Sequence, residues 1–264
     1  MVTNSRVAAR SRSNSLAVTS RTSFSAKRLA YAVIGEKNTE RISSIQFHQN
    51  YSYEDFIQGY RPSPDGFILK NGPFYEFCKK AEADSENKYF FIIDEINRGN
   101  LSKIFGELLM LIEADKRGNE IRMLYSDEPF SVPENLYIIG MMNTADRSLA
   151  MIDYALRRRF SFFNLKPNFD SEGFKKLVKD SGNTKFERFV NAVKSVNNDI
   201  LNDSSLGDGC LIGHSYLCPT DKEVTDEWLH AVLEYDITPL LKEYWFDDTD
   251  KFEDSISRLK EALR

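Results

Sequence analysis

The stretch YFFIIDEINRGN covers residues 89–100. It begins with an apolar run of about six residues bounded by polar ones, which is typical of a strand buried on both faces of a parallel sheet. Asp94 and Glu95 close this run, at the position where open α/β sheets bind their ligands. The sequence therefore predicts an α/β fold with a functional site at the carboxyl end of this strand.

Length, charge and cysteine content limit the class of protein. The chain has 264 residues, enough for one α/β domain and a smaller helical one. Its 35 basic and 40 acidic residues give a formal net charge of −5, which offers no general attraction to DNA or anionic lipid. Cys78, Cys210 and Cys218 lie far apart without metal-ligand spacing, which favours a reduced, cytoplasmic protein. No apolar run approaches the roughly 18 residues of a membrane span.

Strand-like runs alternate with helical patterns up to about residue 167, and the pattern is mainly helical from Asn168 onward. This predicts an α/β core over 24–167 and a helical domain over 168–264, with 1–23 as disordered or misplaced sequence outside both. The first elements expected in the core are a helix in 25–37, a strand in 42–50, a turn-rich surface loop over 51–67, a short helix in 72–84 and a strand in 89–94. They are followed by a helix over 99–119, a hairpin in 122–135, a strand from Leu136, and a helix and last strand within 148–165.

Two of these helices have apolar residues at the spacing of one face. The residues expected on the buried faces are Ala26, Leu29, Ala30 and Val33 in the first helix, which Gly35 would end, and Leu101, Ile104, Phe105, Leu108 and Ile112 in the second, which Asn100 would cap and Gly118 would end.

The Asp-Glu pair suits phosphate transfer. One carboxylate can hold Mg²⁺ while the next activates an attacking water, so we assign the metal to Asp94 and the base to Glu95. The alternative is a pair of solvated acids at a strand end. A second strand end favours the first interpretation, because MMNTADRS places Asn143 where its amide could position the same water. Taken alone, an Asn at a strand end is usually a turn former.

The segment YALRRRF contains three consecutive arginines before an expected strand. Such a run is costly to bury and has no nearby acidic run, so it is expected to meet an anion. An arginine offered to a neighbouring subunit's nucleotide would stabilise charge on the transferred phosphoryl group, and would then lie on the surface of its own subunit. The alternative is a solvated or salt-bridged basic turn.

Three segments together resemble the nucleotide-binding domain of McrB-type restriction NTPases, which belong to the AAA+ superfamily near its dynein-related branch. They are FFIIDEINRGNLSKIFGELLMLIEADKRG, YIIGMMNTADRSLAMIDYALRRRFSF and QFHQNYSYEDFIQGYRP, and the likeness runs from about Phe24 to the C-terminus, including IGHSYL and ITPLLKEYWFDD. The resemblance implies a P-loop NTPase-like parallel sheet with helices on both faces and a C-terminal helical lid.

The resemblance also implies roles for individual residues. Asp94 and Glu95 match the family's second acidic strand motif, and Asn143 matches its sensor asparagine. Arg158 and Arg159 match its trans-acting arginines. The remaining matches are Asp146 and Arg147, which complete the family signature and would bind the nucleotide across the subunit interface.

Partners and cofactors follow from the same resemblance. McrB-type proteins form hexameric rings and hydrolyse ATP or GTP with Mg²⁺, and they drive an McrC-type endonuclease that cuts modified DNA. The resemblance thus implies a homo-oligomeric motor subunit that meets DNA only indirectly and has no membrane role.

The largest departure from the family is the phosphate-binding loop, of the form G-x-x-x-x-G-K-[ST]. It should occupy residues 16–23, which here read LAVTSRTS, so that both glycines and the lysine are replaced and only Ser23 keeps a hydroxyl for the metal. β-branched residues adopt the loop's tight backbone poorly. We therefore keep two functions open: an NTPase domain, and a nucleotide-dead remnant that at most contacts intact ring subunits. The abrupt change of sequence suggests a frameshifted or truncated gene.

His214, in LIGHSYL, is the last candidate. It could reach the nucleotide from the lid, whereas a lone histidine beside a glycine is more often a structural hydrogen-bonding group. His48 and His230 are interpreted as structural.

Overall fold

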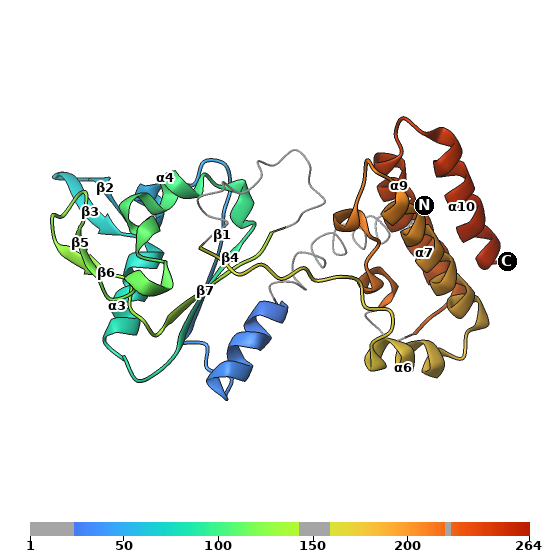
Figure 1. Ribbon diagram of the computed structural model, residues 1–264, viewed down its shortest axis with the longest axis horizontal. Helices are drawn as coiled ribbons and strands as arrows, with labels where there is room; N and C mark the ends of the chain where they lie inside the picture. The colour runs from blue at the N-terminus through green and yellow to red at the C-terminus, as the bar shows by residue number, and fades with distance from the viewer. Residues whose placement is uncertain (1–23, 143–158, 220–222) are drawn as a thin grey trace. The chain divides into compact units, whose positions relative to one another are not determined.

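The computed structural model describes residues 24–142, 159–219 and 223–264, and the chain divides into two compact units (Figure 1). One is an α/β unit within Ser20–Phe162, and the other contains the helical segment Phe163–Arg264. The expected order of an α/β part followed by a helical part is confirmed.

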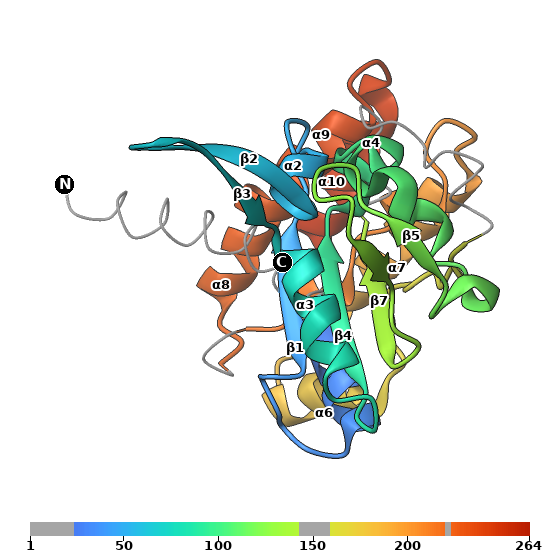
Figure 2. The same ribbon diagram turned by 90° about the vertical axis from the view of Figure 1, so that its left-hand side faces the viewer.

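The α/β unit is built on a parallel sheet with the strand order β1-β4-β7. β1 (Ile42–Gln46) and β7 (Leu136–Gly140) flank β4 (Tyr89–Asp94), whose first five residues are all buried, as the sequence predicted. Gln46 lies opposite Asp94 across the β1–β4 pair, and β4 and β7 run in the same direction. The carboxyl ends of the three strands therefore share one edge of the sheet (Figure 2).

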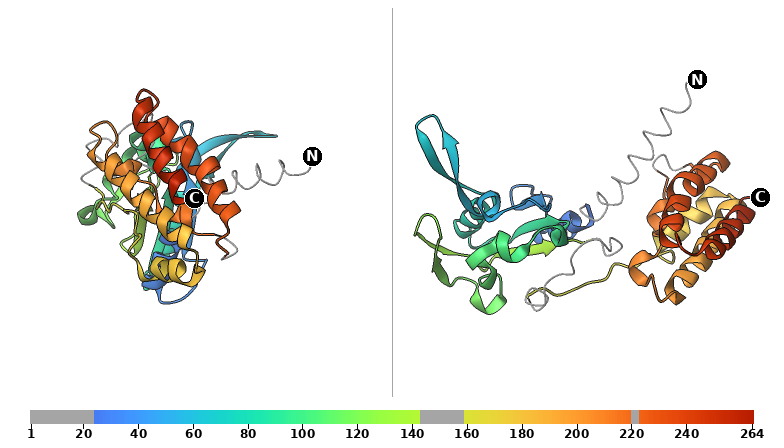
Figure 3. Two further views of the ribbon diagram at one scale, coloured as in Figure 1. Left: turned by 90° about the vertical axis from the view of Figure 1, so that its right-hand side faces the viewer. Right: turned by 90° about the horizontal axis from the view of Figure 1, so that it is seen from above.

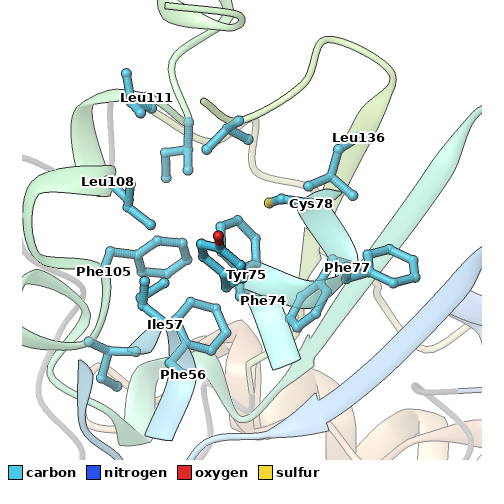
Figure 4. Close-up of a cluster of buried hydrophobic side chains, with 14 of the residues drawn as sticks. Phe56, Ile57, Phe74, Tyr75, Phe77, Cys78, Phe105, Leu108, Leu111 and Leu136 are labelled. Carbon is cyan, nitrogen blue, oxygen red and sulfur yellow. The ribbon is translucent and has the colours of Figure 1, made fainter. Parts of the chain in front are cut away.

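One face of the sheet packs against an aromatic core that includes α3 (Pro73–Glu82). The rings of Phe56 and Phe74 stack with centroids 4.8 Å apart, and both meet Phe91 and Phe105 edge-on. Offset and edge-to-face pairs of this kind add about 0.5–1.5 kcal/mol each beyond area burial. Figure 4 shows this cluster, which fixes the sheet relative to the elements on this face.

The other face of the sheet is contacted by the helix over 24–34, where Ala26 packs with Ile92 and Met141. The helix and its end at Gly35, whose φ is 88°, were predicted correctly. The predicted face was only half right, because Leu29 and Val33 are 57% and 45% exposed. The helix is buried through its small residues instead, and alanine allows the closer approach to the strands.

The long helix expected over 99–119 is broken. Asn100 caps α4 (Leu101–Phe105) as predicted, its side chain accepting a hydrogen bond from the Lys103 amide. At Gly106 φ is 53°, and a side chain there would lie 2.9 Å from the Tyr53 ring. The chain continues in two 3₁₀ turns, Gly106–Met110 and Ala114–Lys116. The apolar spacing still predicted burial correctly, since all five residues of the expected face are buried: Leu101, Ile104, Phe105, Leu108 and Ile112.

The loop expected over 51–67 is instead a short helix, α2 (Tyr53–Phe56), followed by a hairpin of β2 (Gln58–Ser63) and β3 (Gly66–Asn71). The turn residues SPDG reverse the chain between two paired strands and do not belong to a long surface loop. Pro62 is tolerated because β2 pairs with β3 alone and adds no further strand.

The second hairpin, β5 (Glu120–Arg122) with β6 (Pro129–Ser131), confirms the prediction for 122–135. The last expected strand is wrong for its described part, because residues 159–168 contain no strand, and Phe163 is 87% exposed. The described strands give 161–165 no sheet neighbour.

The helical unit has its own apolar core around Phe186, Phe189 and Val193. Within it, the buried side chain of Asn197 accepts a hydrogen bond from the Ile212 amide at 2.7 Å and donates one to the Ile212 carbonyl at 2.9 Å. This pair of hydrogen bonds fixes the glycine-rich segment SLGDGCLIGHSYL, residues 205–217, onto the helix Thr184–Asn202. The helices of the unit, seen in Figure 3, are α6 (Glu172–Ser181), α7 (Thr184–Asn202), α8 (Asp226–Ala231) continued by a π-helix over Val232–Ile237, α9 (Thr238–Tyr244) and α10 (Thr249–Ala262).

Candidate functional site

The candidate site lies where β4 and β7 end. The Met141 amide donates to the Ile93 carbonyl at 2.8 Å, and the Ile96 amide donates back to the Met141 carbonyl at 2.9 Å. On the other side, the Phe47 amide donates to the Asp94 carbonyl at 2.9 Å. Backbone hydrogen bonds thus extend beyond the strands and hold the segments that follow all three of them.

Close packing keeps the two strand ends together. Ile96 lies against Gly140, and a Cβ added to Gly140 would come within 2.6 Å of the Ile96 Cδ1 atom. Real side-chain contacts are never that short, so the absence of a side chain lets the turn after β4 cross the end of β7. Met141, the first residue after β7, is therefore held beside the turn that follows Asp94 and Glu95.

Asp94 is half-buried, and its Oδ1 atom accepts a hydrogen bond from the Glu95 amide at 3.0 Å. This contact fixes the carboxylate at the sheet edge. Carboxylate oxygens are preferred ligands of Mg²⁺, which usually binds only one or two carboxylates together with water and substrate phosphate. The Asp94 carboxylate is therefore a ligand of the kind that Mg²⁺ prefers. In the described ranges, no group of three or more Asp, Glu, His or Cys residues is arranged as a metal site.

Glu95 has an unusual conformation. Its φ of 52° and ψ of 43° are left-handed, a region that costs a side-chain-bearing residue about 1–3 kcal/mol and recurs at functional sites. Only 7% of the residue is exposed, so the alternative of two solvated acids does not hold for Glu95. A buried, strained acid at the end of a parallel strand has a geometry suited to a general base.

Arg98 was missed by the sequence analysis. Its Nε atom lies 3.2 Å from Oε2 of Glu95, and its amide donates to the Glu95 carbonyl at 2.9 Å. The three-residue spacing within DEINR was the available signal, but it is meaningful only if a helical turn follows the strand. That turn is the 3₁₀ helix Ile96–Arg98.

The Arg159 side chain does not lie on the surface, where a trans-acting arginine was expected. Its side chain is 9% exposed and pairs with Glu113 of the same unit at 2.7 Å. The surface position expected for a trans-acting arginine is therefore wrong for Arg159, and the salt-bridged alternative describes it better. Burial is possible because Glu113 compensates the charge, and no local run of acids in the sequence signalled that partner.

Five other predicted residues lie outside the described part of the chain, so their roles stay predictions. They are Ser23, Asn143, Asp146, Arg147 and Arg158.

His214 belongs to the helical unit. Its Nδ1 atom accepts a hydrogen bond from the Asn168 amide at 3.1 Å, and its ring meets the edges of Phe169 and Phe174 with centroids 6.1 and 5.9 Å away. These contacts give His214 a structural role in fixing the start of the helical unit. Its predicted contact with nucleotide stays a prediction.

Comparison with known proteins agrees with this architecture. The family model of the AAA domain (dynein-related subfamily) matches residues 22–160, and that of the McrB α-helical lid domain matches residues 188–253. The chain is 51% identical over 239 residues to the Type IV methyl-directed restriction enzyme EcoKMcrB subunit of Escherichia coli K12, which covers 86% of this chain and 52% of that protein.

Two further proteins are more distant. The Type II restriction enzyme BsuMI component YdiS of Bacillus subtilis 168 is 29% identical over 125 residues, covering 42% of this chain and 36% of that protein. A crystal structure from Cytophaga hutchinsonii covers 84% of this chain and 67% of its own, with 11% identity and a TM-score of 0.31, too low to support an argument.

The parallel sheet with Asp-Glu at its edge and the C-terminal helical unit define an AAA-type α/β protein with a helical lid. The chain belongs to the AAA domain family, dynein-related subfamily, and it carries a lid of the McrB type. It spans about half the length of the Escherichia coli relative. Within residues 24–142, 159–219 and 223–264, no helix combines the length and apolar character of a membrane span.

Proposed function

We propose that this chain carries the nucleoside-triphosphatase domain of a motor subunit in a McrBC-type, modification-dependent DNA restriction system. The observation that carries the proposal is Glu95, a buried acid in a left-handed conformation, next to Asp94 at the edge where β7 also ends. Hydrolysis of ATP or GTP needs a metal-holding carboxylate and a second one near the attacking water.

Each residue of the proposed site has a separate role in hydrolysis. Asp94 would hold Mg²⁺, with Ser23 as a second contact, and the ion would neutralise charge on the phosphates. Glu95 takes the proton of the attacking water. Asn143 orients that water from the end of β7. Arg158 acts on the nucleotide of a neighbouring subunit, because the Arg159 side chain is already paired with Glu113.

A ring of several copies, six by family resemblance, would bring Arg158, Asp146 and Arg147 of one subunit to the nucleotide of the next. An McrC-type endonuclease would be the partner, and DNA would be reached through the complex rather than by this domain. Support comes from the relative named as a methyl-directed restriction enzyme subunit and from the match to the McrB lid. A cytoplasmic location fits such a complex.

The sequence of residues 16–23 favours a second candidate, a nucleotide-dead domain that at most contacts intact ring subunits. A phosphate-binding loop supplies several charge-assisted hydrogen bonds, worth about 1.5–3 kcal/mol each. Losing three of them would weaken binding by roughly three to six powers of ten at about 1.4 kcal/mol per tenfold. We therefore expect no measurable ATP or GTP hydrolysis by the chain as it stands.

Steady-state phosphate release tests both candidates. The chain is compared with a version whose residues 16–23 are rebuilt as a glycine-rich loop after a strand. The rebuilt version should show Mg²⁺-dependent turnover that Glu95→Gln abolishes, and the chain as it stands should show none. Glu95-dependent turnover by the unaltered chain would contradict the importance of the loop. A rebuilt chain that binds nucleotide without turnover would contradict the catalytic assignment.

A further inference from the structure

Arg98 contacts Glu95 through its backbone amide and through its side chain. The Arg98 amide donates to the Glu95 carbonyl at 2.9 Å, and the Arg98 guanidinium Nε lies 3.2 Å from the Glu95 carboxylate. The backbone contact closes the turn that follows β4, and the side-chain contact restrains the acid itself. A substitution of Arg98 removes the second contact and leaves the first.

The pair differs from an ordinary surface ion pair. Lys79 and Glu82 have the same three-residue spacing, and the basic side chains are equally exposed, 40% for Lys79 and 43% for Arg98. The acids are not alike, because 46% of the Glu82 side chain is exposed but only 10% of the Glu95 side chain. Arg98 therefore acts on a carboxylate that water reaches only partly, where a charged hydrogen bond constrains orientation more strongly.

We infer that Arg98 is a positioning residue, which holds the Glu95 carboxylate in the orientation needed to accept a proton from the attacking water. The inference rests on the proposed hydrolysis. In that step the water oxygen forms a bond to the terminal phosphorus, and the bond from that phosphorus to the bridging oxygen breaks, its electron pair leaving with the nucleoside diphosphate. The water proton passes to Glu95. Arg98 stays protonated throughout, since its side chain is only a donor.

Arginine suits this role better than lysine. Its guanidinium is planar and presents donors in a fixed arrangement, so the Nε–H group meets one carboxylate oxygen from a defined direction. Lysine keeps the charge but has a flexible ammonium group with no preferred plane. Arg98→Lys should therefore restore part of what Arg98→Ala loses.

The first test measures kcat and KM for the full chain with residues 16–23 rebuilt. Arg98→Ala should lower kcat by about tenfold to a hundredfold, the effect of a misplaced catalytic group, with KM changed less than about twofold. Arg98→Lys should recover part of kcat, and Lys79→Ala, the matched ion-pair control, should leave kcat unchanged. An unchanged kcat in Arg98→Ala, with Glu95→Gln inactive, would overturn this inference alone. If no version shows Glu95-dependent turnover, both the proposed function and this inference fail.

A second test uses the unaltered chain. By nuclear magnetic resonance, the Arg98 Nε–H proton should exchange with solvent more slowly than that of Arg122, whose side chain is 72% exposed. The difference should disappear in Glu95→Ala. Rapid exchange of the Arg98 proton, or exchange that Glu95→Ala does not change, would overturn the inference.

Discussion

Replacing Glu95 by glycine should make the α/β unit more stable than replacing it by alanine. Both substitutions remove the carboxylate and its contact with Arg98, so the difference between them reports the backbone alone. The perturbation tests the left-handed conformation of Glu95, φ 52°, which is the feature that distinguishes it from an ordinary acid at a strand end.

The size of the effect follows from two opposing contributions. A residue with a Cβ atom loses about 1–2 kcal/mol in the left-handed region, and glycine loses almost nothing there. Glycine also gives the unfolded chain more conformational freedom, which lowers the free energy of unfolding by about 0.5–1 kcal/mol relative to alanine. The difference leaves Glu95→Gly more stable than Glu95→Ala by about 0.5–1 kcal/mol. At a urea dependence of about 2 kcal/mol per molar, the midpoint should differ by about 0.3–0.5 M.

The molecule offers a way to assign the effect to one unit. Its two tryptophans, Trp228 and Trp245, both lie in the helical unit. Tryptophan fluorescence during urea unfolding therefore reports that unit, and far-ultraviolet circular dichroism reports both. The Glu95 substitutions should shift the dichroism transition of the α/β unit and leave the fluorescence transition in place.

Equal midpoints for the glycine and alanine variants, or a more stable alanine variant, would refute the left-handed conformation. A shift seen equally by fluorescence would show that the effect is not confined to the α/β unit.

Two further predictions concern stability. Hydrogen bonds from Ser205, then from Trp245 and Lys251, hold the pKa of Asp203 well below its ordinary value, so its carboxylate stabilises the helical unit fully above about pH 5 and less as pH falls toward the lowered pKa. Urea midpoints of the native chain and Asp203→Asn, measured by tryptophan fluorescence, should lie closer together at pH 3 than at pH 7 without becoming equal, and an equal gap at both pH values would contradict this. Gly72→Ala should destabilise the α/β unit by about 1–3 kcal/mol, because the added Cβ atom would lie 2.4 Å from the Phe56 backbone. The control Gly173→Ala lies in a helix with no atom within 4 Å of the added Cβ, so it should be neutral or stabilising. Urea midpoints by dichroism that rank the two variants in the opposite order would show that the packing described at Gly72 is wrong.

The sequence predicted what depends on local apolar patterns. The buried strand before Asp94, the cap at Asn100 and the burial of Phe105 and Leu108 all follow from periodicity and from side-chain chemistry at neighbouring positions. The same patterns predicted parallel strands whose carboxyl ends share one edge of the sheet, as β1, β4 and β7 do. The position of Asn143 beside Asp94 stays a prediction.

The rest depends on contacts between distant parts of the chain. The helix after Asn100 breaks because Gly106 leaves room for the Tyr53 ring, which lies far back in the sequence. Arg159 is buried because Glu113 compensates its charge, and no local pattern connects the two. Arg98 reaches Glu95 through the 3₁₀ turn Ile96–Arg98, which starts from a left-handed Glu95, and the sequence of a non-glycine residue does not signal that conformation.

We propose that Asp94, Glu95 and Asn143 act as one hydrolytic site. The most direct measurement is a double-mutant comparison of kcat in the chain with residues 16–23 rebuilt, using Glu95→Gln, Asn143→Ala and the two combined. Residues that act on the same water are strongly non-additive, so the double variant should lose no more activity than the worse single one. Losses in the double variant that equal the product of the two single losses would show that the residues act independently, and would contradict the claim.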